Sequence, residues 1–367
     1  MSRTQIGLDV GGSGVRAAEL AGGRRPQLRR FAQVPLRPGV VRAGTVGDPE
    51  ALAGALRELW SRGRFSTKDV RLGVANGAVL VRQLDLDWMP PADFRKALRY
   101  QVQDVLPFSV DEANLDYHLV EDLEVAGVDG TPRRVARILL VAASREMIDG
   151  LVAAAERAGL RVCGVDLVPF AALRARHRLG PACDRPEALI DVGSDVIAVV
   201  VHTAGVPAYA RIIPGVGGEA ITKAIQDTYE WAWEDAERTK VFVGLPGHAR
   251  LDDSQRSVLG PGRDGLDHAA QQVVAGTVDR LVSEIATTLD FYRDSADPAV
   301  AGIERIVLTG AASRLGGFDE HLTAALQVPV EHLDVRPGLR VPGRLRITEA
   351  DAPALTVASG LGLGVPR

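Results

Sequence analysis

The sequence predicts an α/β protein built of two lobes, and three observations lead to this prediction. The chain has 367 residues, more than the roughly 250–300 residues at which a single hydrophobic core stops growing. Short apolar strand patterns alternate with amphipathic helix patterns, which is typical of α/β folds. Two widely separated strands also end in the same phrase, so we expect two lobes built on one plan.

The repeated phrase lies at residues 6–12, IGLDVGG, and returns at residues 188–194, ALIDVGS. In each copy an aspartate ends the strand, and the chain then continues as a second apolar strand. Each copy therefore predicts a β-hairpin at the start of a lobe. We expect Asp9 and Asp191 to face each other across the cleft between the lobes.

The other elements follow in order along the chain. Strand patterns occupy residues 5–10, 71–74, 138–142, 188–191 and 303–308. Helix patterns occupy residues 49–60, 91–106 and 145–158, the last of them followed by Gly159, a residue type favoured just after a helix. A second hairpin is expected from strands 118–125 and 133–141, turned by residues 127–130.

Two segments interrupt the alternation of strands and helices, and we interpret each as a subdomain inserted into its own lobe. The first lobe is expected at residues 1–185, with an insertion at about 85–160 that holds a helix and a hairpin. The second lobe is expected at residues 186–367, with an insertion at about 219–300. This second insertion is mostly helical around a loop rich in glycine, proline and charged residues.

The two aspartate–glycine phrases have the chemistry of a phosphate site. Glycine lets backbone N–H groups approach anionic oxygens, and a carboxylate at a strand end can hold hydrated Mg²⁺. Asp-x-Gly is also common in hairpin turns, so this prediction depends on both copies. A third phrase, residues 306–314, runs from a buried strand into a small-residue turn. That turn either lies against a purine or is an ordinary βα turn.

Composition and charge argue against several classes of function. The formal net charge is −4 and the pI is near 6.0, which argues against a nucleic-acid surface. Cys163 and Cys183 show no CxxC spacing, so we expect reduced structural thiols. We find no secretory signal and no apolar run long enough for a spanning helix. We therefore expect a cytoplasmic protein that a partner recruits to a membrane, without direct insertion.

Longer phrases carry a specific family resemblance. They include IGLDVGGSGVRAAEL at the start, LPFSVDEANLDY at residues 106–117, VDLVPFAALRA at residues 165–175, and LTGAASRLGGF near the end. Over nearly the whole chain, the sequence resembles the PilM family of type IV pilus assembly, which is related to the cell-division protein FtsA. The resemblance implies a two-lobed actin-like (actin/DnaK-type chaperone/sugar kinase) α/β fold with a subdomain insertion in each lobe and a cleft for an adenine nucleotide.

The resemblance also implies which residues bind ATP or ADP with Mg²⁺. The first phosphate loop would consist of Asp9, Gly11, Gly12, Ser13, Gly14 and Arg16. The second would consist of Asp191, Gly193 and Ser194, with Gly217 and Gly218 nearby. Glu237 and Lys240 match positions that approach the ribose and adenine, and Gly310, Ala311, Ala312, Ser313 and Arg314 match the adenosine turn. Asp9 and Asp191 would hold Mg²⁺ through water.

The sequence departs from the family pattern at three points. The basic residue of the first loop is usually lysine and is here Arg16, which keeps the charge but changes its geometry. Val196 and Ile197 replace hydroxyl side chains that usually face the terminal phosphate. Ala311 and Ala312 replace two glycines, at a cost of roughly 1 kcal/mol wherever φ must be positive. We therefore expect weak nucleotide binding and at most slow ATP hydrolysis, and no catalytic residue is identified.

The resemblance further implies a nucleotide-binding scaffold of type IV pilus assembly or a related secretion system. Its partner would be the cytoplasmic N-terminal peptide of a PilN-like inner-membrane protein, received between the insertion at 85–160 and the first lobe. One alternative is a ROK-type sugar kinase, which usually carries a cysteine-rich zinc loop. Another is an FtsA-like filament-forming protein, whose terminal amphipathic helix we do not expect at residues 359–367. Whether the chain forms a homo-oligomer stays open.

Overall fold

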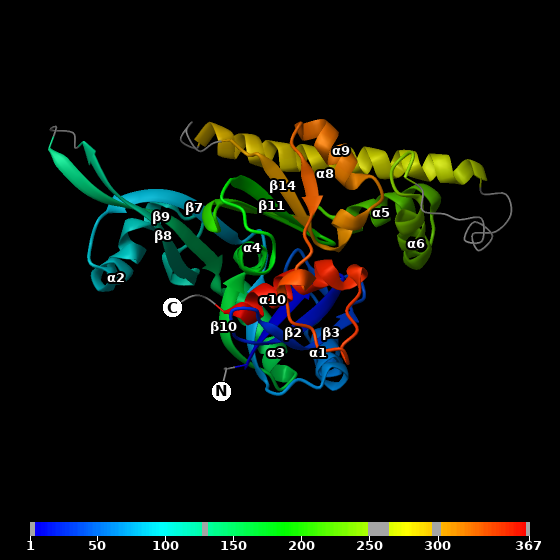
Figure 1. The fold of residues 1–367 in the computed structure, drawn as a ribbon, viewed down its shortest axis with the longest axis horizontal. Helices are drawn as coiled ribbons and strands as arrows, with labels where there is room; N and C mark the ends of the chain where they lie inside the picture. The colour runs from blue at the N-terminus through cyan, green and yellow to red at the C-terminus, as the bar shows by residue number, and fades with distance from the viewer. Residues whose placement is uncertain (1–3, 127–130, 249–263, 296–301, 365–367) are drawn as a thin grey trace.

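Three large β-sheets organise the molecule (Figure 1). The computed structural model describes residues 4–126, 131–248, 264–295 and 302–364. Two five-stranded sheets form the two lobes, and a three-stranded sheet projects sideways, at the left of the view. The alternation of strands and helices read from the sequence is confirmed by this arrangement.

The first sheet has the strand order β10-β6-β1-β2-β3. Its strands are β1 (Thr4–Gly11), β2 (Gly14–Ala21), β3 (Gln27–Pro35), β6 (Asp69–Val74) and β10 (Arg161–Leu167). β1 and β2 form the antiparallel hairpin predicted from the first phrase, and β6 runs parallel to β1. One hydrophobic cluster joins this sheet to α1 (Pro49–Gly63) and α3 (Arg145–Arg157), with a small ribbon of β4 (Val41–Arg42) and β5 (Thr45–Val46) beside them.

The second sheet repeats this plan in the order β13-β12-β11-β14-β15. Its strands are β11 (Pro186–Val192), β12 (Val196–Thr203), β13 (Val206–Pro214), β14 (Arg305–Thr309) and β15 (Val330–His332). β11 pairs antiparallel with β12 and parallel with β14. Its own cluster includes α5 (Gly218–Tyr229), α6 (Trp233–Val243), α8 (Asp264–Ser295) and α9 (Phe318–Leu326). No helix in the described ranges, α8 included, has the length and apolarity needed to cross a bilayer.

Two helices, α4 (Val168–Leu179) and α10 (Ala352–Leu363), join the lobes. They form one hydrophobic cluster with strands of both five-stranded sheets. Glycines allow α10 to approach its neighbours closely. A β-carbon on Gly360 would lie 1.8 Å from the carbonyl oxygen of Ala171, and one on Gly7 would lie 2.1 Å from that of Ala358. Any larger residue at either position would therefore push α10 away from α4 or β1.

The third sheet has the order β7-β9-β8. It consists of β7 (Val79–Asp87), β8 (Ala113–Ala126) and β9 (Pro132–Ser144), with α2 (Pro91–Gln101) packed on it. The predicted hairpin is confirmed as β8 and β9, and its turn at 127–130 lies outside the described residues. β7 is not among the predicted strands, although apolar and acidic residues alternate from Leu84 to Asp87.

The predicted helix at 91–106 is wrong at its C-terminal end. α2 ends at Gln101, and residues 103–105 form a separate 3₁₀ turn. Pro107 disfavours the helical conformation in the residue before it, and Leu106 accordingly has an extended ψ of 140°. The bounds of the lobes and insertions stay predictions. Within the first expected insertion, α3 packs with α1 in the hydrophobic cluster that joins both helices to the first sheet.

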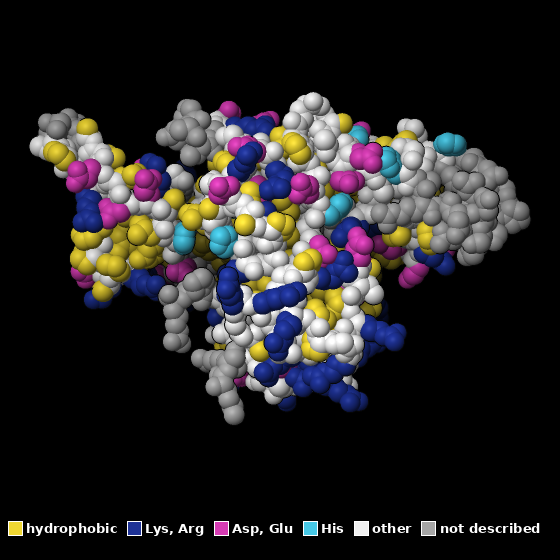
Figure 2. Space-filling view, in the orientation of Figure 1, with side chains coloured by type: hydrophobic (Ala, Val, Ile, Leu, Met, Phe, Trp, Pro, Cys, Tyr) yellow, Lys and Arg dark blue, Asp and Glu magenta, His cyan; other side chains and the backbone are white. Residues whose placement is uncertain are grey.

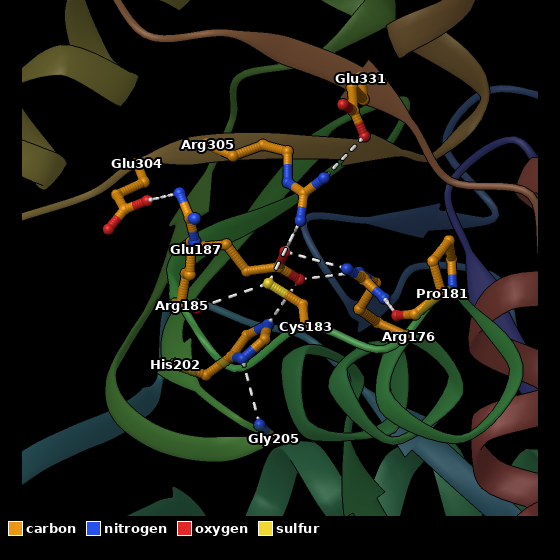
Figure 3. Close-up of polar contacts among 10 residues, drawn as sticks. All are labelled: Arg176, Pro181, Cys183, Arg185, Glu187, His202, Gly205, Glu304, Arg305 and Glu331. Carbon is orange, nitrogen blue, oxygen red and sulfur yellow. Dashed lines mark hydrogen bonds and ion pairs between the residues drawn. The ribbon is translucent and has the colours of Figure 1, made fainter.

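A buried ionic cluster lies at the start of β11 (Figure 3). Glu187 is fully buried, and its Oε1 lies 2.7 Å from Arg176 Nε and 3.1 Å from His202 Nε2. Its Oε2 lies 3.3 Å from Arg305 Nη2. His202 Nδ1 accepts a hydrogen bond from the N–H of Gly205 at 3.4 Å, which leaves Nε2 on the side of Glu187. The cluster links α4 with three strands of the second sheet.

Candidate functional site

The two aspartate–glycine hairpins meet at a cavity of about 490 Å³ between the lobes. This volume is within the usual range of small-molecule sites. The predicted residues on its wall are Asp9, Gly11, Gly12, Ser13, Arg16, Asp191, Gly193, Ser194, Gly310, Ala311 and Arg314. The structure thus brings both expected phosphate loops and the third turn to one cavity, while the roles of these residues stay predictions.

Arg16 braces the first loop from its place opposite Asp9 in the hairpin. Its Nη1 lies 3.4 Å from Asp9 Oδ2 and 3.3 Å from the carbonyl oxygen of Gly14, and its Nη2 donates to Ser13 Oγ at 3.0 Å. Gly14 does not line the cavity, because it faces β3, where a β-carbon would lie 2.8 Å from the carbonyl oxygen of Val34. Arg16 therefore contributes both order and positive charge to the wall.

Gly12 of the first loop packs directly on the second loop. A β-carbon on Gly12 would lie 2.7 Å from both Ser194 Oγ and Asp195 Oδ1, so a larger residue would force the two loops apart. Asp195 Oδ2 accepts a hydrogen bond from the N–H of Ala43 at 2.5 Å. Asp195 is not among the residues predicted from the sequence, because this contact joins residues 152 positions apart.

Partial burial raises the pKa of both aspartates at the cavity. It raises the pKa of Asp9, and the charge and hydrogen bond of Arg16 oppose that rise. Burial, together with the negative charge of Asp9, raises the pKa of Asp191 to about 7, again opposed by Arg16. The charge of Arg16 therefore opposes the rise in pKa of both partly buried carboxyl groups. A bound divalent cation would supply the positive charge that this part of the cavity lacks.

The third predicted element is a strand that runs into a 3₁₀ turn. β14 ends at Thr309, Gly310 follows with a φ of +87°, and residues 311–314 form the turn. A β-carbon on Gly310 would lie 2.4 Å from the carbonyl oxygen of Val192, so glycine is required there for both space and conformation. Residues 311 and 312 do not have positive φ, and alanine therefore adds no backbone strain at either position.

Four other predicted residues support the loops from outside the cavity wall. Gly217 packs on the second loop, where a β-carbon would lie 2.5 Å from the carbonyl oxygen of Ser194. A β-carbon on Gly218 would lie 2.9 Å from that of Ala312, so this alanine fills the space between the third turn and α5. Ser313 is buried and donates to the carbonyl oxygen of Gly310 at 2.8 Å. These residues shape the loops without lining the cavity.

The predicted adenine-side pair, Glu237 and Lys240, also lies off the cavity wall. Lys240 Nζ lies 2.7 Å from Glu237 Oε2 and donates to Thr222 Oγ1 at 2.9 Å and to the carbonyl oxygen of Gly218 at 3.1 Å. Burial lowers the pKa of Lys240, and the carboxylate of Glu237 opposes this effect. The structure therefore places this pair against the N-terminal turns of α5, and its predicted contact with a nucleotide stays a prediction.

The apolar wall of the cavity is not predicted from the sequence. Val168 from α4 and Pro353, Ala354 and Val357 from α10 line it. In the sequence these residues have the pattern of ordinary core helices, and only the docking of α10 between the sheets brings them to the cleft. No local signal indicates that placement.

A second cavity, a groove of about 610 Å³, lies where the inserted sheet meets β10 and α4. Its wall includes residues 114–118 of β8, Val141 and Ala143 of β9, Ile148 of α3, residues 165–167 of β10, and Phe170, Leu173, Arg174, His177 and Arg178 of α4. The predicted partner-binding region, 85–160, thus contributes one side of this groove. Arg71 and Val74 of β6 also line it, together with Gly205 and Pro207.

Two outer strands face this groove. β8 is the outer strand of the inserted sheet, and β10 is the outer strand of the first sheet. Residues 114–118 and 165–167 line the groove consecutively, whereas side chains alternate between the two faces of a strand. The strand edges themselves therefore border the groove. Such edges can pair with an extended peptide through backbone hydrogen bonds.

Comparison with known proteins gives a match over most of the chain. Residues 7–365 match the family described as Type IV pilus assembly protein PilM. Among solved structures, the chain is similar to the PilM-PilN type IV pilus biogenesis complex, with a TM-score of 0.81 and 25% identity over 99% of this chain and 98% of that chain. It is also similar to MreB 5 of Spiroplasma citri bound to AMPPNP, with a TM-score of 0.52 and 14% identity over 98% and 95% of the two chains. This second likeness concerns the fold alone.

Curated relatives include two cell division proteins FtsA. The Bacillus subtilis protein is 31% identical over 155 residues, which cover 40% of this chain and 33% of the relative. The Escherichia coli protein is 26% identical over 248 residues, which cover 64% of this chain and 56% of the relative. The chain thus spans between a third and just over half of these relatives. Together with the solved structures, they confirm the predicted two-lobed actin-like fold.

Proposed function

This chain belongs to the PilM family of type IV pilus assembly proteins, and we propose that it acts as an assembly scaffold with two binding sites. The cleft between the lobes binds ATP or ADP with Mg²⁺. The groove beside the inserted sheet binds the cytoplasmic N-terminal tail of a PilN-like inner-membrane protein, which brings the chain to the inner face of that membrane. The observation that carries this proposal is the structural match to the PilM-PilN complex over 99% of the chain.

The composition of the cleft supports a nucleotide with Mg²⁺. The glycine loops give anionic oxygens access to backbone N–H groups, and Arg16 adds positive charge at the wall. Asp9 and Asp191 would hold Mg²⁺ through water. No cluster of three ligating side chains occurs among the described residues, so water and phosphate would supply the other ligands, as is usual for this ion. The bound cation would offset the charge of two carboxyl groups that share one arginine.

Mg-ATP should raise the melting temperature of the protein. A ligand at 100 times its dissociation constant stabilises the folded state by about 2.7 kcal/mol, which differential scanning fluorimetry detects. Asp9→Asn should remove the Mg²⁺-dependent part of the shift, because it removes a carboxylate at the proposed cation site. Asp149→Asn, on the exposed face of α3, is the matched control and should leave the shift intact. No shift at millimolar Mg-ATP would contradict the nucleotide site, and an equal shift in both variants would contradict the role of Asp9 at the cation site.

Hydrolysis of the bound nucleotide should be very slow or absent. Val196 lines the cavity just after the second loop, and Ile197 is buried in the core, so neither position offers a hydroxyl to a terminal phosphate. Phosphate release should stay near background in a steady-state assay. A rate of about 1 per second, which is ordinary for enzymes, would contradict this expectation and favour the sugar-kinase alternative.

The groove supports the partner half of the proposal. Its strand edges and its apolar lining from Ile148, Phe170 and Leu173 suit a short extended peptide that pairs its backbone and buries alternate side chains. Calorimetric titration of the full chain with the PilN-like tail as a synthetic peptide tests this assignment. We expect binding at micromolar or lower concentration, and an absence of binding would refute it.

A further inference from the structure

One edge of the first lobe is strongly basic. Six exposed arginines lie on the β2–β3 turn, on β3 and on the segment before α10. They are Arg24, Arg25, Arg29, Arg340, Arg344 and Arg346. Figure 2 shows Lys and Arg side chains predominating over the lower part of the molecule, where Figure 1 places β2, β3 and α1, while acidic side chains lie mainly above them. We call these six residues the arginine edge.

Backbone contacts make the arginine edge one continuous surface. The N–H of Leu28 on β3 donates to the carbonyl oxygen of Arg340 at 3.0 Å, and the N–H of Arg340 donates to that of Pro26 at 2.8 Å. Arg25 Nη2 donates to the carbonyl oxygen of Pro337 at 2.8 Å. The segment before α10 therefore runs beside β3, although more than 300 positions separate the two in the sequence.

No carboxylate of the described residues neutralises the arginine edge. Arg29 donates to Thr4 Oγ1 at 3.2 Å and Arg340 to Gln27 Oε1 at 3.1 Å, both uncharged acceptors. Nearby acids are engaged by other groups. Glu19 is buried and pairs with Arg30 at 2.8 Å, and Asp334 pairs with Arg336 at 2.8 Å. Glu349 lies 3.7 Å from Arg314. Asp351 accepts a hydrogen bond from the hydroxyl of Thr348 at 2.8 Å. The edge thus carries unbalanced positive charge on a chain of net charge −4.

Protection of a sheet edge explains only part of this pattern. Charged side chains on an outer strand prevent unwanted pairing with other chains, and Arg29 lies on β3, the outer strand of the first sheet. Arg344 and Arg346 lie outside any strand. Selection against sheet pairing therefore does not account for them.

We propose that the arginine edge contacts the headgroups of an anionic phospholipid membrane. Its charge is complementary to such a surface, to which each basic residue adds attraction. The exposed large hydrophobic residues lie elsewhere on the molecule. They are Trp88, Tyr100, Leu119, Val206, Val241 and Phe291. The proposed contact is therefore electrostatic and involves no insertion into the bilayer. The same lack of exposed aromatic side chains removes the stacking platform that single-stranded nucleic acids use.

This inference goes beyond the proposed function, because it gives the chain a membrane contact of its own. The groove borders β10 and the arginine edge includes β3, and these are opposite outer strands of one sheet. The two surfaces therefore do not overlap, and contact of the arginine edge with lipid leaves the groove free for the partner's tail. Two weak contacts held together give much stronger retention than either alone.

Co-sedimentation with vesicles tests the arginine edge directly. The full chain should sediment at low salt with vesicles of phosphatidylglycerol and phosphatidylethanolamine, and should not sediment with phosphatidylcholine vesicles. Arg24→Gln/Arg344→Gln/Arg346→Gln should lower the partition coefficient by about a hundredfold, roughly fivefold per arginine. These three side chains make no hydrogen bond or ion pair to another described residue, so their replacement should preserve the fold. High salt should abolish binding, because it screens exposed charges.

A matched triple variant distinguishes a specific surface from total charge. Arg133→Gln/Arg161→Gln/Arg185→Gln removes the same charge from exposed arginines paired with Asp87, Asp69 and Glu304, and it should retain vesicle binding. Equal losses in both variants, no binding by the wild type, or equally tight binding of duplex DNA would each overturn the proposal. The PilN-like tail should bind the wild type and both triple variants with equal affinity. If the wild type binds the tail but not the vesicles, the membrane contact alone is refuted. If the wild type does not bind the tail, the partner assignment is refuted.

Discussion

Replacing Glu187 by glutamine should lower the free energy of unfolding by about 3–5 kcal/mol, the range for removing one partner of a buried ion pair. Glu187 is fully buried, and Arg176 is only 3% exposed. The substitution removes the negative charge while leaving the guanidinium of Arg176 in the interior. Urea denaturation at neutral pH measures the change, because the midpoint falls with stability when the slope stays constant.

Glu304→Gln is the matched control for this substitution. Glu304 lies in the same region (Figure 3) and pairs with Arg185 at 2.8 Å, but both side chains are exposed. Exposed ion pairs contribute little to stability, so this variant should unfold at nearly the wild-type urea concentration. Equal midpoints for the two variants would show that the buried cluster is not a determinant of stability.

The effect of Glu187→Gln should depend on pH. Burial opposes ionisation of Glu187, but hydrogen bonds from His202 and Arg176 outweigh it and lower the pKa to about 2. In the unfolded chain a glutamate titrates near 4.3. A carboxyl group whose pKa is depressed by folding contributes stability above its unfolded pKa, and this contribution is lost as pH falls toward the folded value. The stability difference between wild type and variant should therefore be constant above about pH 5 and shrink below it.

Local sequence signals predict the parts of the fold that depend on neighbouring residues. α1 begins where Asp48 Oδ1 accepts the N–H of Ala51 at 3.0 Å and Pro49 occupies the first turn. α3 is followed by Gly159 with a φ of +77°. Each of these features depends on residues within one or two helical turns of the helix end. The predicted helices accordingly begin at the observed residues. The predicted end of α2 is wrong because the chain leaves the α-helix after Gln101, whereas Pro107 accounts only for the extended conformation of Leu106.

The residues of the candidate sites likewise differ in whether a local sequence signal predicts them. The sequence predicts Asp9 and Asp191 because each lies near the end of a strand in a repeated phrase, and the packing of the two lobes brings both to one cavity. Asp195, the apolar wall from α10 and the groove residues of α4 depend on the docking of elements far apart in the chain. The sequence pattern of Val357 or Phe170 is that of any core helix residue, so only the three-dimensional arrangement reveals what else these side chains contact.

Val165→Trp should weaken binding of the PilN-like tail by about a hundredfold or more, a loss of about 2.7 kcal/mol. Val165 lies on β10, is half-buried and lines the groove. A tryptophan there would occupy the volume beside the strand edge into which the tail is expected to insert. Aromatic residues are well tolerated in strands, so the fold should persist. Calorimetric titration with the synthetic tail measures the loss, and the melting temperature verifies folding.

Val162→Trp supplies the matched control, because Val162 lies on the same strand, is also half-buried and packs on the same hydrophobic cluster, but does not line the groove. It should bind the tail with wild-type affinity, and any destabilisation common to both variants then cancels in the comparison. Equal affinities in the two variants would place the tail elsewhere on the molecule. Weakened binding in Val165→Trp alone, with Mg-ATP still raising the melting temperature of both proteins, would assign the tail to the groove and leave the cleft between the lobes as an independent site.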